Sequence, residues 1–268
     1  MRNASRYRSR KSSRRPLVVV VVIAAIIGVL GIGGLALANS STFAVQQVTV
    51  SGASHITSEE LTELAAVPQG TTLLNVDANG ISSRLTSNPW VKSASVERVF
   101  PNTLNLAIDE RQITAVVEVT VDTSNTKEKW ALSSDGMWIM KIPDRDSEEG
   151  KSIASQVYDD ADKVLSITDI PNGAVPEAGT YCNNANVDNA LSIIDGMTTE
   201  LADRVKGVSA ASSDSTTLTL DNGVEIAFGD STDIRDKERV CLELLEKYPD
   251  QISYINVRVV NKPVWRSL

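Results

Sequence analysis

The sequence predicts an α+β protein with a single N-terminal transmembrane helix, a β-α-α-β-β unit, and a mixed β-domain with a penultimate helix and a terminal edge strand. Three observations indicate this fold class. A long apolar segment lies near the N-terminus. Two short segments with helix-capping signals follow it. Beyond them, short apolar segments alternate with Gly-, Asn- and Asp-containing turns, as is typical of strands.

The first forty residues predict a membrane anchor. Seven basic residues and no carboxylate lie within the first fifteen positions. The next segment, 17–38, is uncharged and rich in Val, Ile, Leu and Gly, and a helix of this length spans a hydrocarbon layer of about 30 Å. Because basic residues are retained in the cytoplasm, we expect a cytoplasmic tail over 1–16, one crossing of the inner membrane over 17–38, and export of the chain beyond Asn39.

A cleaved signal peptide is the alternative interpretation of this segment. Ala36-Leu37-Ala38 fits the small-x-small pattern of a cleavage site, and cleavage there would release a secreted, adhesin-like protein. The apolar core of a signal peptide has ~7–15 residues, however, and this one is longer. Length therefore favours an anchor.

The exported part is acidic, with 19 basic and 34 acidic residues and a net charge of −15. This charge disfavours nucleic acid as a partner. Cys182 and Cys241 both lie in the exported part, where a disulfide can form. A buried, unpaired Cys241 in a helix is the other possibility.

The first exported segments predict a strand over 43–50 and two short helices. Thr57 and Glu60 have the spacing of a capping box, and Ile56 and Leu61 that of a hydrophobic staple. We expect the first helix to end at Pro68-Gln69-Gly70. The second begins at Asp77 and stops at Asn88-Pro89. Both helices are too short to be stable alone.

A β-hairpin is expected to provide the sheet that these helices cover. The segment 90–99 is typical of a strand, and Phe100-Pro101-Asn102 of a turn. In the next strand, 103–109, Leu104, Leu106 and Ile108 alternate with polar or small residues and face inward.

Several short motifs of this unit occur together in order, and each is listed here as it stands in the sequence: Val48-x-Val50-x-Gly52, Asn75-Val76-Asp77, Asn88-Pro89-Trp90-Val91, Val96-Glu97-Arg98 with Pro101, and Asp109-Glu110-Arg111. With them, residues 43–111 resemble the POTRA domain of the bacterial cell-division family FtsQ/DivIB. In that family the domain follows a single transmembrane helix, as is expected here.

The remainder, 112–268, predicts a β-domain. The expected elements are strands over 115–121 and 130–139, a turn at Ser134-Asp135-Gly136, a helix over 187–197, strands over 205–211, 216–220 and 224–228, a type I′ turn at Asp221-Asn222-Gly223, a helix from Asp233 to Lys247, and a last strand over 253–260. We interpret the acidic stretch 144–162 as a solvated loop. The run from Leu218 to Val260 again resembles the FtsQ/DivIB β-domain.

No catalytic constellation is apparent, and we assign no catalytic, cofactor-binding or metal-binding residue. His55 is the single histidine, and its position before a helix cap indicates a turn residue. The carboxylates of Asp221, Asp230 and Asp233 lack the spacing of a calcium loop and are expected in turns and caps. The sequence therefore predicts neither an enzyme nor a small-molecule substrate.

The resemblance implies a scaffold of the divisome at the septum, with partners resembling FtsB and FtsL and a link to septal cell-wall synthesis. It also implies that the last strand, 253–260, accepts a partner strand by β-augmentation. The candidate residues are Tyr254, Asn256, Arg258, Val259, Val260 and Trp265. Asn256 stands where the family has a carboxylate, and Val259 where it has an aromatic residue. The alternative is an exported, membrane-anchored enzyme or peptidoglycan-binding protein with a POTRA-like domain.

Overall fold

The computed structural model describes residues 23–28, 41–121, 126–171 and 174–268. The expected tail over 1–16 and most of the expected membrane helix, 17–22 and 29–38, lie outside the described residues. Residues 23–28 are helical and exposed. Within the described ranges, we find no helix with both the length and the apolar character that a membrane crossing needs.

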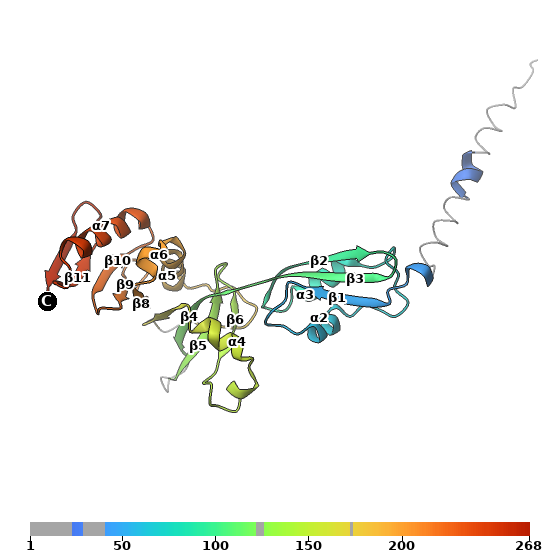
Figure 1. Ribbon diagram of the computed structural model, residues 1–268, viewed down its shortest axis with the longest axis horizontal. Helices are drawn as coiled ribbons and strands as arrows, with labels where there is room; N and C mark the ends of the chain where they lie inside the picture. Colours follow the sequence, from blue (N-terminus) through green and yellow to red (C-terminus); the bar gives the residue numbers. More distant parts are fainter. Residues whose placement is uncertain (1–22, 29–40, 122–125, 172–173) are drawn as a thin grey trace, which may run out of the picture.

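The first unit is a three-stranded sheet covered on one face by two helices (Figure 1). Its elements are η1 (Ser41–Phe43), β1 (Gln47–Ser51), α2 (Ser58–Ala65), α3 (Ala78–Leu85), β2 (Val91–Val99) and β3 (Thr103–Glu110). The strand order is β1-β3-β2, with β1 parallel and β2 antiparallel to β3. The expected β-α-α-β-β order is confirmed.

Capping and alternation explain these elements. The Thr57 side chain accepts a hydrogen bond from the Glu60 N–H at 3.2 Å, and the Asp77 side chain accepts one from the Gly80 N–H at 3.0 Å, so both helix starts are confirmed. Leu104, Leu106 and Ile108 are buried, as their alternation predicted.

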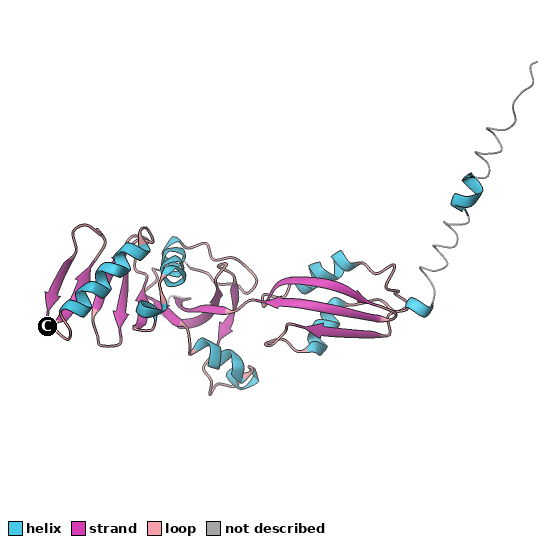
Figure 2. Cartoon of the chain, turned by 45° about the horizontal axis from the view of Figure 1, so that its top comes forward, coloured by secondary structure: helices cyan, strands magenta, loops and turns pink. Residues whose placement is uncertain are grey.

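The second unit contains a mixed nine-stranded sheet in the order β12-β11-β10-β9-β8-β7-β4-β5-β6. Figure 2 shows strands of this unit with helices beside them. The strands are β4 (Ile113–Thr120), β5 (Lys127–Ser133), β6 (Trp138–Ile142), β7 (Leu165–Thr168), β8 (Val205–Ser209), β9 (Thr216–Leu220), β10 (Glu225–Gly229), β11 (Ile252–Asn256) and β12 (Val264–Ser267). The helices α5 (Ala185–Gly196), α6 (Thr199–Ala202) and α7 (Ile234–Lys247) accompany this sheet. Most of its core lies between the sheet and these helices.

Two turns depend on glycines with positive φ angles. Gly136, in the β5–β6 turn, has φ of 78°, and Gly223, in the β9–β10 turn, has φ of 81°. Asn222 has no positive φ, so the expected type I′ turn is wrong. Hydrogen bonds from Gly223 N–H to Leu220 O and from Leu220 N–H to Val224 O instead form a three-residue loop that ends in a left-handed glycine.

The acidic stretch 144–162 is not a solvated loop, which corrects the sequence interpretation. It contains η2 (Gly150–Ser152) and α4 (Ser155–Ala161). Val157 and Tyr158 are buried, and the Tyr158 hydroxyl donates to the carbonyl oxygens of Pro143 at 3.1 Å and Gly150 at 3.3 Å. Two buried apolar residues on one side are sufficient to hold this short helix against the rest of the protein.

The expected terminal edge strand is also corrected. β11 ends at Asn256, and β12 pairs with it in antiparallel register on its outer side. The chain from Val257 to Pro263 is the connection between these two strands. The outermost strand of the sheet is therefore β12, and the stretch 253–260 is interior or turn.

Both cysteines are free thiols. Cys241 is buried in α7 and Cys182 is half-buried before α5. Burial raises the pKa of the Cys182 thiol to about 11 and that of Cys241 to about 12. Both are therefore poor nucleophiles at neutral pH.

Candidate partner-binding surface

The two edges of the nine-stranded sheet differ in how open they are. At β6, the outer backbone of Trp138 is occupied, because its N–H donates to Thr180 O and its carbonyl accepts from Gly179 N–H, both at 2.9 Å. A further hydrogen bond joins Cys182 N–H to Gly136 O at 2.7 Å. No strand among the described residues pairs with the outer side of β12. Of the two edges, β12 is therefore the one whose outer side has no paired segment along its length among the described residues.

The register of β12 shows which backbone groups face outward. Leu268 N–H donates to Gln251 O at 3.0 Å, so it points toward β11. In an antiparallel pair, hydrogen-bonded and non-hydrogen-bonded positions alternate. Ser267, opposite Ile252, and Trp265, opposite Ile255, are the non-hydrogen-bonded positions. Both N–H groups and the Trp265 carbonyl therefore point away from the sheet and are available to a further strand. The Ser267 carbonyl instead accepts a hydrogen bond from the Ser253 hydroxyl at 2.8 Å.

Two of the candidate residues lie on one face of β11. Tyr254 pairs with Arg266 of β12, whose guanidinium carbon lies 4.3 Å from the centre of the tyrosine ring. Asn256 pairs with Val264, and its side-chain oxygen accepts a hydrogen bond from Arg258 N–H at 3.2 Å. Val264 is 59% exposed. This face of the sheet therefore carries the Arg266 guanidinium over the Tyr254 ring, with the exposed Val264 side chain beside them.

The remaining candidates lie elsewhere. The Arg258 guanidinium donates to Ser215 Oγ at 2.5 Å, and its aliphatic part covers Gly229, where a Cβ would lie 2.9 Å from Arg258 Cγ. Val259 and Val260 belong to the turn after β11, and Val259 is 58% exposed. The structure therefore does not bring Arg258 and the two valines to the sheet edge.

The Trp265 side chain packs on the face of the sheet that is turned toward the core, so it is not a free aromatic anchor. It stands opposite the buried Ile255 and stacks on Tyr248, at the end of α7, with ring centres 4.6 Å apart. Trp265 and Tyr254 thus lie on opposite faces of the sheet.

Sequence reasoning missed Val264 and Arg266 as edge residues. The turn residues Asn261 and Pro263 were the signal that a hairpin could follow the expected last strand.

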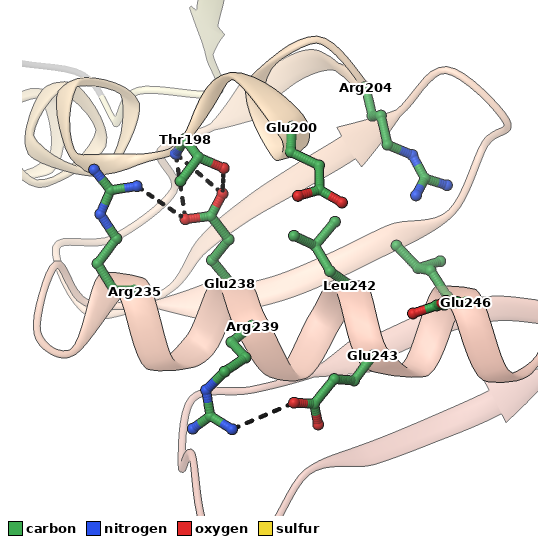
Figure 3. A pocket seen from close by; sticks show the side chains of 10 residues that line it. Thr198, Glu200, Arg204, Arg235, Glu238, Arg239, Leu242, Glu243 and Glu246 are labelled. Atoms are coloured by element: carbon green, nitrogen blue, oxygen red, sulfur yellow. Dashed lines mark hydrogen bonds and ion pairs between the residues drawn. The ribbon is translucent and has the colours of Figure 1, made fainter.

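A charged hollow of about 580 Å³ lies beside α7, where it faces α6 (Figure 3). Glu238, inside it, is nearly fully buried, and its carboxylate accepts hydrogen bonds from the Thr198 N–H at 3.0 Å and from the Thr198 hydroxyl. Arg235 lies 3.5 Å from the same carboxylate. Glu238 thus satisfies the N-terminus of α6, which is a structural role.

The rest of this hollow carries both signs of charge, with Glu200 and Arg204 on one side and Arg239, Glu243 and Glu246 on the other (Figure 3). Arg239 pairs with Glu243 at 3.3 Å. The Glu238 carboxylate accepts hydrogen bonds from both the Thr198 hydroxyl and the Thr198 N–H, as a cap of α6 would. The mixed charges of this hollow are suited to contact with a polar polypeptide. Among the described residues, no group of His, Cys, Asp and Glu side chains could hold a metal ion.

His55 holds the two units together, instead of being a surface turn residue. Its ring stacks on Trp90 with centres 4.3 Å apart. One ring nitrogen lies 3.0 Å from Glu110 Oε2, and the other lies 3.0 Å from Asp160 Oδ2 of α4. Only 8% of the side chain is exposed.

Arg111 makes a second connection between the units. Its Nη1 donates to the carbonyl oxygens of Pro89 at 3.0 Å and Val91 at 2.8 Å, and its Nε lies 3.0 Å from Asp135 in the β5–β6 turn. Partial burial of Asp135 favours its neutral form, but hydrogen bonds from Ser133 and Arg111 outweigh this effect and lower the pKa of its carboxyl group. One apolar cluster also continues from the first unit into β4 and α4.

Two protein-family models match this chain. The model of the FtsQ-type POTRA domain matches residues 43–111. The model of the C-terminal part of the cell division protein FtsQ/DivIB matches residues 145–258. Together they cover the first unit and residues 145–258 of the second, whereas β4, β5, β6 and β12 lie outside both matches.

Curated relatives agree with these models. The chain is 35% identical to the cell division protein FtsQ of Geobacter sp. strain M21 over 100 residues, which are 36% of each chain. It is 25% identical to FtsQ of Syntrophotalea carbinolica over 248 residues, 88% of this chain and 78% of the relative. With FtsQ of Mycolicibacterium smegmatis it shares 30% identity over 221 residues, 82% of this chain and 57% of the relative. The alignments thus span between about a third and three quarters of these relatives' own lengths.

Proposed function

Because this chain belongs to the FtsQ/DivIB family of cell-division proteins, we propose that it is a bitopic membrane scaffold of the divisome. In this proposal the protein recruits and links division proteins at the septum and couples them to septal cell-wall synthesis. Residues 1–16 form the cytoplasmic tail, 17–38 the membrane anchor, 43–111 the POTRA domain and 112–268 the β-domain. The exported domains are then positioned to meet other division proteins outside the inner membrane.

The partners in this proposal are small membrane proteins resembling FtsB and FtsL, and the docking element is β12. This step rests on a difference between the two edges of the sheet. The segment 179–182 hydrogen-bonds to the outer backbone at the start of β6, whereas no described segment pairs with the outer side of β12. An open edge strand can pair with an extended partner segment, and main-chain hydrogen bonds then supply much of the affinity. The exposed Val264 and the Arg266–Tyr254 pair lie beside this edge and would contact the partner's side chains.

A proline substitution at the outward-facing position of β12 tests the docking element. Ser267→Pro removes a backbone donor that points away from β11, and proline is tolerated on edge strands. Ser267→Ala is the matched control, since it removes the hydroxyl and keeps the N–H. One backbone hydrogen bond contributes about 0.5–1.5 kcal/mol, so we expect Ser267→Pro to lower recovery of the FtsB and FtsL homologues roughly two- to tenfold.

The measurement is cross-linking and co-purification from membranes that contain the full-length chain. Both variants must first be retained in the membrane at the wild-type level. Recovery of both homologues by Ser267→Pro at the level of Ser267→Ala would rule out β12 as the docking strand. A proline at Val257 is not a suitable test, because the Val257 N–H donates to Ala227 O inside the sheet at 3.1 Å.

A further inference from the structure

The large apolar side chains that are exposed on the POTRA domain lie together at one end of the domain. Among the described residues between 43 and 111, the exposed large hydrophobic side chains are Leu74 (45%), Val99 (48%) and Phe100 (56%). Val99 and Phe100 lie where β2 turns into β3, and Leu74 lies in the loop between α2 and α3. We call the three segments that meet here, 41–46, 69–76 and 98–103, the POTRA tip.

Hydrogen bonds and a ring contact hold the tip together. Leu73 N–H donates to Phe43 O at 2.8 Å, and Gln46 N–H donates to Asn102 O at 2.9 Å. The rings of Phe43 and Phe100 meet edge to face, with centres 5.7 Å apart. The exposed side chains are therefore carried on an ordered surface, rather than on a loose loop.

The charge of the tip differs from that of the rest of the exported chain. Its twenty residues include no Asp or Glu and one cation, Arg98. The exported part as a whole has a net charge of −15. A surface without carboxylates avoids repulsion by anionic lipid headgroups, and a basic side chain is attracted to them.

The tip is also the part of the ectodomain that adjoins the predicted membrane segment. Figure 1 shows η1 at the same end of the domain as the β2–β3 turn. Phe43 follows Ala38, the last residue of the predicted span, by five positions. Five residues reach at most about 18 Å. The headgroup layer is about 6 Å thick on each side of the hydrocarbon, so the tip is within reach of the membrane surface.

From these observations we infer that the POTRA tip rests on the outer face of the membrane, with Phe100, Val99 and Leu74 inserted at the boundary between headgroups and acyl chains. This inference rests on the proposed membrane anchor. It adds a second lipid contact, which would set the angle at which the POTRA domain, and through it the β-domain, stands on the membrane. Aromatic and aliphatic side chains carried on a fixed surface are suited to this position.

The experiment measures lipid contact at the tip in the full-length chain, reconstituted in nanodiscs of phosphatidylcholine and phosphatidylglycerol. Phe100→Cys and, separately, Leu74→Cys are labelled with an environment-sensitive fluorophore. Burial of the native cysteines raises their thiol pKa values to about 11 and about 12, so the introduced, exposed cysteine reacts first at neutral pH. The unsubstituted chain serves as the labelling blank. Val264→Cys is the matched control, because Val264 is 59% exposed but lies on β12 at the far end of the ectodomain (Figure 1).

Lipid brominated on the acyl carbons nearest the headgroup should quench the label at both tip positions roughly twofold or more, since the inserted depth is ~5–10 Å. The label at Val264 should keep its fluorescence. Absence of quenching at both tip positions, in chains that resist alkaline extraction from the membrane, overturns the inference and leaves the anchor intact; the tip would then have to contact a protein. Loss of the chain on alkaline extraction would instead refute the anchor, and with it this inference.

Discussion

At the residue scale, Lys237 is a buried cation with a partly exposed partner. Its side chain is 1% exposed, and its ammonium donates to the backbone oxygen of Asp230 at 2.8 Å and to the Asp230 carboxylate at 2.7 Å. The ring of Phe228 lies beneath it, with its centre 5.4 Å away. The hydrogen bond from Lys237, with a further one from Thr232, lowers the pKa of Asp230 to about 2. These contacts hold the segment between β10 and α7 against the first turns of α7.

This pair predicts a pH-dependent contribution to stability. The pKa of Asp230 is lower in the folded chain than the value of ~3.9 expected in the unfolded chain, so the contribution is complete above about pH 4 and is lost as the pH falls toward 2. We expect Asp230→Asn to cost about 1–3 kcal/mol at neutral pH, because the buried ammonium loses its charged partner. Thermal unfolding of the purified fragment 41–268 should show this cost shrinking between pH 4 and pH 2.

The matched control for this prediction is Lys237→Met, which removes the buried charge and keeps an apolar chain of similar length. In that background Asp230→Asn should have little effect at any pH. An Asp230→Asn cost that is unchanged by Lys237→Met, or that persists at pH 2, would contradict the assigned pairing.

At the scale of elements, α4 connects the β-domain to the POTRA domain. Asp160 is 27% exposed, and its carboxylate lies 3.0 Å from the His55 ring and 2.9 Å from Lys163. Asp159, one position earlier, is 61% exposed and lies 4.0 Å from Arg145. The two neighbouring carboxylates therefore have unequal roles: Asp160 contacts the other domain, and Asp159 faces solvent.

We expect Asp160→Ala to loosen α4 and Asp159→Ala to leave it unchanged. Loss of this partly exposed contact should make the amides that it protects exchange roughly two- to fivefold faster. Hydrogen–deuterium exchange over residues 52–57 and 155–162 measures this effect. Equal exchange in the two variants would mean that the His55 contact does not hold the helix.

At the scale of the whole molecule, the distribution of charge predicts the topology. Seven basic residues precede the predicted span, and no charge lies within it. A reporter fused after Leu268 should therefore be active when it requires export and inactive when it requires the cytoplasm. The reverse result would overturn the anchor, the tip contact and the proposed meeting place with partners together.

The sequence by itself determined the elements whose signals are local. Capping residues placed α2 and α3, because Thr57 and Asp77 bind backbone groups three positions away. Alternation placed the inward row of β3, because a period of two is visible within one strand. The order of short motifs identified the family for the same reason: each motif is a few residues long and needs no knowledge of contacts.

Only the tertiary structure decided which strand forms the edge and how the two domains meet. Residues 253–260 have the composition of a strand at any position in a sheet, and whether a strand is an edge depends on what pairs beside it. Here β12 takes the outer position and leaves Trp265 packed on Tyr248. His55 likewise gives no local sign of its role, because its partner Asp160 lies 105 residues further along the chain. Contacts over such distances follow from how whole elements pack, and a periodicity or a cap reports only on its own element.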